Sequence, residues 1–361
     1  MTASIPSGTG KPVETALVLS GGNALGAYHG GVHEELEARG IRPGWVAGTS
    51  VGALTAAILA GNRPEHRQER LRQYWEEAAQ ASFWPIPTDD ARLREFYSAA
   101  HIVNALAFGR PGIYRHRFPG ALSALPWLPN DVALYDQAPL RRTLERLIDF
   151  DLLNRAETRL SFVCIDVETG EEVLFDNTQD RIDARHLLAA VALMPIFQPV
   201  EVDGRLLCDA GLGNNLPVDR VLEDPPERDM VCFASDLHSM RGDRPKRLNA
   251  AFQRTEDLVF SSQGRRNIAG LRREYALRDR YEPRGSRVTL VHVIYDAPEL
   301  ELAGKLFDFS PGSIRDRWAA GRRQMAKALD MLPKRPEPEG RFDYFAVAPE
   351  PAETARKHRG S

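Results

Sequence analysis

The serine at position 50 lies between two glycines, in the order Gly48-Thr49-Ser50-Val51-Gly52. A serine hydroxyl can attack an ester carbonyl when a neighbouring base removes its proton, and a G-x-S-x-G turn between a strand and a helix exposes such a nucleophile. Glycines suit the turn because it brings backbones too close together for side chains. The pattern therefore predicts acyl-transfer chemistry, provided that a strand precedes it and a helix follows it.

The residues on either side of this turn have the required character. An apolar run, 45–47, precedes the serine, and a run rich in alanine and leucine, 53–60, follows it. Ser50 would then stand at a helix N-terminus, where free N–H groups favour negative charge. We therefore interpret Ser50 as the candidate nucleophile of a nucleophile elbow.

A glycine-rich loop follows an earlier apolar run. Residues 15–19 are typical of a buried parallel strand, and Gly21, Gly22 and Asn23 come soon after them. Acyl transfer requires N–H donors that stabilise an oxyanion, and the backbone of such a loop can present several of them to one point. These three residues are the candidate oxyanion donors.

The candidate base is Asp209. Residues 199–208 are expected to form a hairpin, which delivers this aspartate to a second turn that contains glycines. A carboxylate is a poor base at its ordinary pKa of about 4, so we expect partial burial to raise the pKa of Asp209.

These motifs, in this order, resemble those of the patatin-like phospholipases. The resemblance covers roughly residues 15–235. It rests on four segments, namely the glycine loop 21–26, the elbow 48–54, the proline-ended helix 188–195 and the turn Asp209-Ala210-Gly211.

The resemblance implies a specific chemistry. A Ser50–Asp209 dyad would replace a Ser–His–Asp triad, with an oxyanion hole formed by Gly21, Gly22 and Asn23. It also implies an acyl-enzyme, the hydrolysis of lipid or other carboxylic esters, and no metal or cofactor.

Four positions, Asn23, Leu25, Ala190 and Ala210, depart from the family pattern, and two of them lie where the backbone of a catalytic loop is at stake. Asn23 stands where a third glycine is usual, and asparagine is the residue that best tolerates a positive φ after glycine, so we expect the loop to keep its shape. Ala210 replaces the glycine after the aspartate, and it would be strained if that position required a positive φ.

Strands and helices alternate from residue 15 onward, which predicts the α/β class. We expect three α/β/α layers around a mainly parallel central sheet, which is the patatin-like arrangement. The expected organisation is a disordered tail 1–14, a catalytic domain 15–235 with a cap-like aromatic insertion at 82–130, a C-terminal extension 236–335 packed on the core, and a loose tail 336–361.

Composition limits the partners and the location. The chain has 361 residues and a net charge of −3, which gives no reason to expect nucleic acid, and the expected partner is a lipid or ester substrate. Its three cysteines lie in apolar, strand-like segments, which favours a reducing compartment and a cytoplasmic location. No run approaches the roughly 20 apolar residues of a membrane span, so any membrane contact would be peripheral.

Three other interpretations are open at this stage. Ser50 and Asp209 could act with His238 or His292 in a triad, although α/β-hydrolases place the oxyanion loop and the elbow later in the strand order. A dinucleotide-binding domain would need an acidic residue near the end of the second strand, where the elbow stands. A catalytically weak or inactive member of the same fold could bind lipid through its aromatic stretch, 83–127, and its basic stretch, 241–280.

Overall fold

The structure is a computed structural model that describes residues 13–79, 91–125, 127–224, 226–282, 285–295, 304–336 and 338–347. Its main-sheet strands are β1 (Glu14–Leu19), β2 (Trp45–Gly48), β5 (Arg159–Asp166), β6 (Glu172–Asp176), β7 (Val200–Val202), β8 (Arg205–Asp209), β9 (Met230–Asp236), β10 (Val288–Ile294) and β11 (Phe342–Val347). A separate pair is formed by β3 (Arg115–His116) and β4 (Tyr135–Asp136).

The α-helices are α1 (Ala27–Ala38), α2 (Val51–Ala60), α3 (Pro64–Ala79), α4 (Ala91–Phe108), α5 (Ala138–Leu147), α6 (Phe150–Leu153), α7 (Ala184–Ala190), α8 (Asp219–Leu222), α9 (Leu248–Tyr281) and α10 (Pro311–Met331). Short 3₁₀ turns are η1 (Asn23–Gly26), η2 (Gly120–Ala124), η3 (Ala210–Leu212), η4 (Lys305–Phe307) and η5 (Leu332–Lys334).

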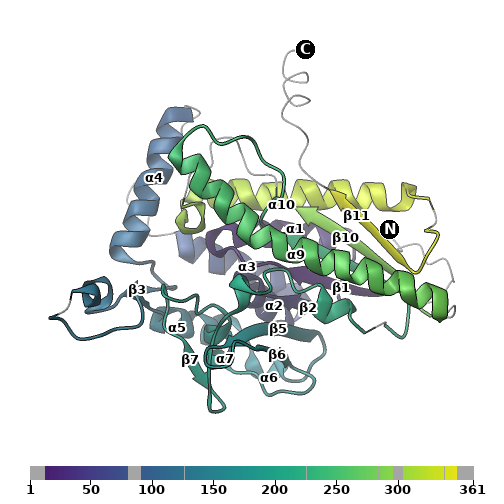
Figure 1. The fold of residues 1–361 in the computed structure, drawn as a ribbon, viewed down its shortest axis with the longest axis horizontal. Helices are drawn as coiled ribbons and strands as arrows, with labels where there is room; N and C mark the ends of the chain where they lie inside the picture. The colour runs from purple at the N-terminus through teal and green to yellow at the C-terminus, as the bar shows by residue number, and fades with distance from the viewer. Residues whose placement is uncertain are drawn as a thin grey trace.

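Apart from the β3–β4 pair, the described strands form one nine-stranded sheet in the order β11-β10-β9-β1-β2-β5-β8-β7, with β6 paired to β5. Figure 1 shows β11 and β10 at one end of this sheet and β5, β6 and β7 toward the other. The strands from β11 to β5 in that order run parallel. The last part is antiparallel, because β8 pairs with β5 and then with β7 in a hairpin. The expected mainly parallel α/β sheet is confirmed.

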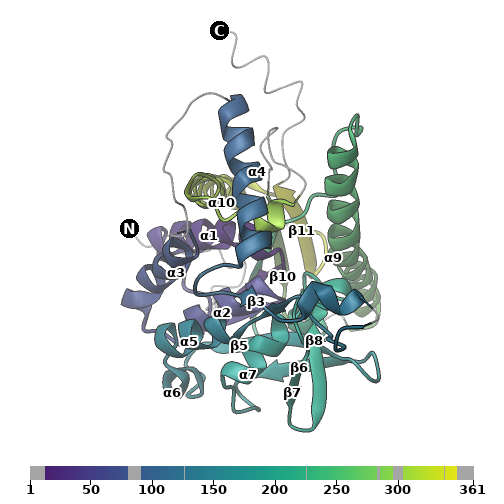
Figure 2. The same cartoon turned by 90° about the vertical axis from the view of Figure 1, so that its left-hand side faces the viewer.

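The alternation of side chains along β1 explains the layers. Leu17 and Leu19 point into one hydrophobic core, with α1, α2, α3, α5, α7 and α10, whereas Ala16 and Val18 point into a second core, with α8 and α9. Because both faces of the strand are buried, the run is continuously apolar. Figure 2 shows α9 on one side of the sheet and α1, α3 and α10 on the other.

The C-terminal third of the chain is built into the same sheet. β10 extends the parallel order next to β9, and α10 packs on α1 so closely that a side chain on Gly31 would overlap the carbonyl oxygen of Trp318. The expected loose tail from residue 336 is wrong for residues 342–347, which form β11 at the edge of the sheet. Phe345 and Val347 pack into one core and Phe342 against the other, so this short segment gains enough burial to join the sheet.

Parts of every expected region lie outside the described residues. The longest are residues 1–12 of the expected N-terminal tail, residues 82–90 of the aromatic insertion, residues 296–303 of the C-terminal extension, and residues 348–361 of the expected C-terminal tail. The three cysteines lie on β5, β8 and β9 and are unpaired. No helix in the described residues is long and apolar enough to cross a bilayer.

Candidate active site

The turn at Ser50 has the geometry that its sequence predicts. β2 ends at Gly48, α2 begins at Val51, and Ser50 caps the helix with φ 56° and ψ −128°. This conformation is strained for a residue with a side chain, and such strain persists only where the surroundings fix the backbone. A side chain on Gly52 would overlap the carbonyl oxygen of Leu19, so glycine is required where the turn meets the end of β1.

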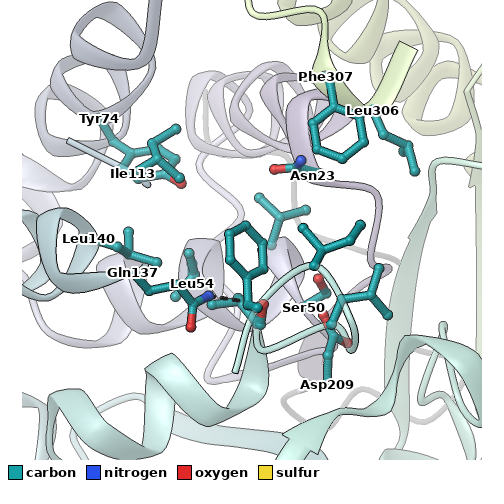
Figure 3. A pocket seen from close by; sticks show the side chains of 15 residues that line it. Asn23, Ser50, Leu54, Tyr74, Ile113, Gln137, Leu140, Asp209, Leu306 and Phe307 are labelled. Atoms are coloured by element: carbon teal, nitrogen blue, oxygen red, sulfur yellow. Dashed lines mark hydrogen bonds between the residues drawn. The ribbon is translucent and has the colours of Figure 1, made fainter. Parts of the chain in front are cut away.

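Asp209 lies at the end of β8, and its side chain meets Ser50 (Figure 3). Its carboxylate accepts a hydrogen bond from the Gly211 N–H at 2.8 Å, and Ser50 lines the same cavity beside it. The residue is only 4% exposed, and this burial raises the pKa of Asp209 to about 6, although the interactions with Ser50 and Gly211 act in the opposite direction. The carboxylate is therefore ionised at neutral pH but more basic than an exposed one.

The two departures in the catalytic loops cause no evident problem in the backbone. Asn23 has φ 46°, a left-handed conformation that asparagine tolerates well. Ala210 begins the turn η3 and is not among the residues with positive φ, so no glycine is needed at that position.

One of the three expected oxyanion donors is already engaged. The N–H of Gly21 donates to the carbonyl oxygen of Asn215 at 3.1 Å, and the Asn215 side-chain amide donates back to the Gly21 carbonyl at 3.2 Å. This pairing fastens the glycine loop to the turn that follows Asp209. It takes the Gly21 N–H away from the oxyanion position, which differs from the sequence-based expectation.

The elbow is also hydrogen-bonded to the segment that follows Asp209. The Thr49 hydroxyl donates to the Asn214 carbonyl at 2.8 Å. The ends of β1, β2 and β8 thus meet in one hydrogen-bonded cluster. Ser50, Asp209 and Asn23 line a common cavity within it.

Two buried polar side chains from the C-terminal third support these loops, and motif analysis missed both. Gln263, on α9, accepts from the Asn215 N–H at 2.7 Å and donates to the Leu212 carbonyl at 3.0 Å. Arg317, on α10, is 1% exposed and donates to the carbonyl oxygens of Ala24, Asp308 and Lys305 at 3.1, 2.7 and 3.2 Å.

Of these two residues, only Arg317 could have been recognised from the sequence around it. It lies on the face of its helix that also carries Ile314, Gly321 and Met325, and a charged residue on an apolar face needs a buried partner. Gln263 lies in a largely polar helix, where nothing in the sequence distinguishes it from exposed neighbours.

Two cavities meet at Ser50. The larger has a volume of about 560 Å³, and its wall is mostly aliphatic and aromatic, including Leu54, Tyr74 and Leu140. Leu306 and Phe307 of η4 close one side of it (Figure 3). The smaller, of about 320 Å³, lies toward Gly22, Asn215 and His238.

Neither histidine of the alternative triad is bound to Asp209. His238 contacts Asp257 with its Nδ1 at 3.3 Å, and His292 contacts Asp236 with its Nε2 at 3.1 Å. Each imidazole is thus oriented by a different carboxylate. Asp209 instead contacts the serine directly, so a Ser50–His–Asp209 triad is not formed.

The fold and these contacts define an α/β protein with a serine and a buried aspartate in direct contact at the ends of its strands. A family model described as patatin-like phospholipase matches residues 17–222, more than half of the chain. A second model, described as patatin phospholipase, matches residues 259–340. The chain therefore belongs to the patatin-like phospholipase family.

Similarities to individual proteins are either short or of low sequence identity. The triacylglycerol lipase ptl3 of Schizosaccharomyces pombe is 40% identical over 60 residues, which is 17% of this chain and only 12% of that protein. VipD from Legionella pneumophila has a TM-score of 0.43 and 16% identity, over 89% of this chain and 67% of its own. The type III effector protein ExoU has a TM-score of 0.35 and 14% identity, over 89% of this chain and 53% of its own.

Proposed function

We propose that the protein hydrolyses lipid or other carboxylic esters through a Ser50–Asp209 dyad and an acyl-enzyme. The observation that carries the proposal is that Ser50, on the strained turn of the elbow, and the buried Asp209 line the same two cavities, with burial raising the pKa of Asp209 to about 6. Membership of the patatin-like phospholipase family supports lipid esters as the substrate class.

The proposed reaction begins with proton transfer from Ser50 to Asp209 as the serine oxygen attacks the ester carbonyl. The resulting oxyanion would face the N–H groups of Gly22 and Asn23, because the Gly21 N–H is bound to Asn215. When the intermediate collapses, the carbon–oxygen bond to the alcohol breaks, and Asp209 returns the proton to the departing oxygen. A water molecule then gives a proton to Asp209 as its oxygen attacks the acyl carbon. The bond from that carbon to Ser50 Oγ breaks, Asp209 returns the proton to the serine oxygen, and the fatty acid leaves.

The larger cavity fits the acyl part of such a substrate. Its largely apolar wall is suited to a hydrocarbon chain that begins at Ser50. Burial of the chain there would exclude water from the reacting carbonyl and strengthen the hydrogen bonds to the oxyanion.

Two variants test the dyad. Ser50→Ala and Asp209→Ala should each lower ester hydrolysis by at least about 10³-fold while the circular dichroism spectrum stays native. A fluorophosphonate should label wild-type Ser50, and mass spectrometry should locate the adduct. Retained hydrolysis in either variant would contradict the dyad. A folded wild type that binds lipid vesicles but forms no adduct would support the alternative, a catalytically inactive lipid-binding member.

We also propose a peripheral membrane contact through the exposed aromatic side chains of Phe96, Phe108, Phe118 and Trp127. Each of these side chains is at least 74% exposed, and exposed aromatic residues can insert at a lipid surface. Replacing Phe118 and Trp127 together by serine should weaken co-sedimentation with phosphatidylcholine vesicles. Hydrolysis of a soluble p-nitrophenyl butyrate should not change. Unchanged vesicle binding would exclude this contact.

A further inference from the structure

His238 lies just after β9, is 1% exposed, and lines the smaller cavity together with Ser50 and Asp209. Its Nε2 is buried and has no hydrogen-bond partner among the described residues. A Cβ on Gly22 would lie 3.4 Å from this nitrogen, which places Nε2 beside the glycine loop. An unpaired buried polar atom costs stability, so its presence beside a reactive serine suggests that a ligand completes its hydrogen bonding.

The other side of the imidazole is fixed by a chain of contacts. Nδ1 lies 3.3 Å from Oδ1 of Asp257 on α9, and the Phe260 ring packs on the imidazole at 4.9 Å between centroids. The buried ammonium of Lys305 donates to the same carboxylate oxygen at 2.6 Å. Burial alone would raise the pKa of Asp257, but hydrogen bonds from His238 and Lys305 hold it below its ordinary value, so the carboxylate is ionised.

This cluster is poorly suited to a metal ion. His238, Glu256 and Asp257 bring ligand-type atoms within 4.8 Å of one another. However, the Lys305 ammonium already supplies the positive charge at Asp257. A second cation would be repelled by it at close range.

The charges around the smaller cavity limit what it can bind. Among the described residues that line it, Asp209 is a carboxylate and none is lysine or arginine, so an anionic group would be repelled. Because Asp257 is ionised, Nδ1 of His238 donates to it, which leaves Nε2 available to a ligand. The matching ligand group is an uncharged hydroxyl.

We infer that the smaller cavity is a subsite for the leaving alcohol, in which Nε2 of His238 accepts a hydrogen bond from a hydroxyl of a glycerol-type alcohol. The inference rests on the proposed function, because it assigns the two sides of Ser50 to the two halves of an ester. The acyl chain lies in the apolar cavity, and the polyol lies beside Gly22 and His238. His238 is then a specificity-determining residue that acts on the substrate alcohol and takes no proton from Ser50.

Two esters with the same acyl chain and different alcohols distinguish recognition of the alcohol from support of the fold and from proton transfer. kcat/KM is measured for 1-decanoylglycerol and for ethyl decanoate, which lacks the additional hydroxyls. His238→Ala should lower the value for the glycerol ester by about five- to tenfold and change the value for the ethyl ester by less than about twofold. His238→Gln, whose amide oxygen can accept the same hydrogen bond, should recover part of the loss.

The control variant is His33→Gln, which removes a buried imidazole that contacts Gln68 and does not line either cavity. It should not change the ratio between the two esters. Thermal unfolding and fluorophosphonate labelling of Ser50 establish that each variant is folded. If His238→Ala unfolds, His238→Leu, which fills the space but cannot accept a hydrogen bond, should show the same selective loss on the glycerol ester.

Three results would overturn the inference. An equal loss on both esters would mean that His238 only supports the fold. Near-total loss on both, in a folded variant that no longer reacts with the fluorophosphonate, would assign the histidine to proton transfer. A wild type that hydrolyses neither ester and is not labelled would overturn the proposed function itself, and the subsite with it.

Discussion

The two parts of this chain contribute to one site in different ways. Residues 13–236 carry Ser50, Asp209 and the glycine loop, at the ends of β2, β8 and β1. Residues 237–347 carry no group that our mechanism uses as nucleophile or base, yet Gln263 and Arg317 bind the backbone of two of these loops. The reacting groups therefore come from one region of the sequence, and part of the support for their loops comes from the other.

The difference follows from what tight loops require. Their backbone polar groups cannot all pair with one another, and a buried group without a partner costs about 1–3 kcal/mol. Here a long side chain from another layer supplies the missing donors. Arg317 binds three carbonyl oxygens at once, and one of them, Ala24, belongs to the glycine loop. The C-terminal third would then matter for activity although it does not touch the reacting atoms.

The largest effect is expected in the N-terminal part, from Asp209→Asn. Hydrolysis should fall by at least about 10³-fold, because an amide cannot accept the proton of Ser50. The free energy of unfolding of Asp209→Asn should exceed that of the wild type at neutral pH. Raising the pKa of a buried carboxyl from 3.8 to about 6 costs about 3 kcal/mol once the group is ionised in the folded state.

The sign of the pH dependence provides a check on this variant. Between pH 4 and pH 6 the folded wild type holds a proton that the unfolded chain has released, so the wild type loses stability as the pH rises through that range. The gain in Asp209→Asn, measured by urea unfolding, should therefore be largest above pH 6 and should disappear near pH 4. A gain that does not vary with pH would have a cause other than ionisation.

A variant of comparable severity in the C-terminal part is Arg317→Met. It keeps the volume of the side chain but leaves the carbonyls of Ala24, Lys305 and Asp308 without this donor, so the free energy of unfolding should fall by about 3–5 kcal/mol. The rate of fluorophosphonate labelling at Ser50 should also fall, at a temperature where the variant is still folded. Arg315→Met, on the exposed face of the same helix, is the matched control and should change neither measurement.

A normal rate of fluorophosphonate labelling in folded Arg317→Met would contradict a role of Arg317 in activity. The C-terminal third would then stabilise the fold without positioning the glycine loop.

The sequence could predict the residues that carry the chemistry but not those that support their loops. The elbow and Asp209 were recognisable because their chemistry requires particular residues at short spacing, and the strand β1 because both its faces are buried. The engagement of the Gly21 N–H, the support from Gln263 and the strand β11 depend on contacts between residues far apart in the chain. Local patterns carry little information about such contacts.

A smaller effect is expected from Gln263→Leu, which removes both hydrogen bonds between α9 and the turn after Asp209. The free energy of unfolding should fall by about 1–3 kcal/mol, because the Asn215 N–H and the Leu212 carbonyl lose their partner in the interior. Gln253→Leu, at a partly exposed position of the same helix, is the control and should have little effect. If both variants unfold alike, the two hydrogen bonds of Gln263 do not stabilise this turn.

The smallest effect is expected at the wall of the larger cavity, where the C-terminal part contributes Phe307. Phe307→Ala removes an aromatic ring from a cavity of about 560 Å³, so short acyl chains lose a contact while longer chains gain room. The ratio of kcat/KM for p-nitrophenyl dodecanoate to that for the butyrate should rise by about three- to tenfold. Phe252→Ala, which removes a 64% exposed ring from α9, should leave this ratio unchanged. An unchanged ratio in Phe307→Ala would mean that the acyl chain does not reach η4, and that the C-terminal third supports the site without shaping its selectivity for the acyl chain.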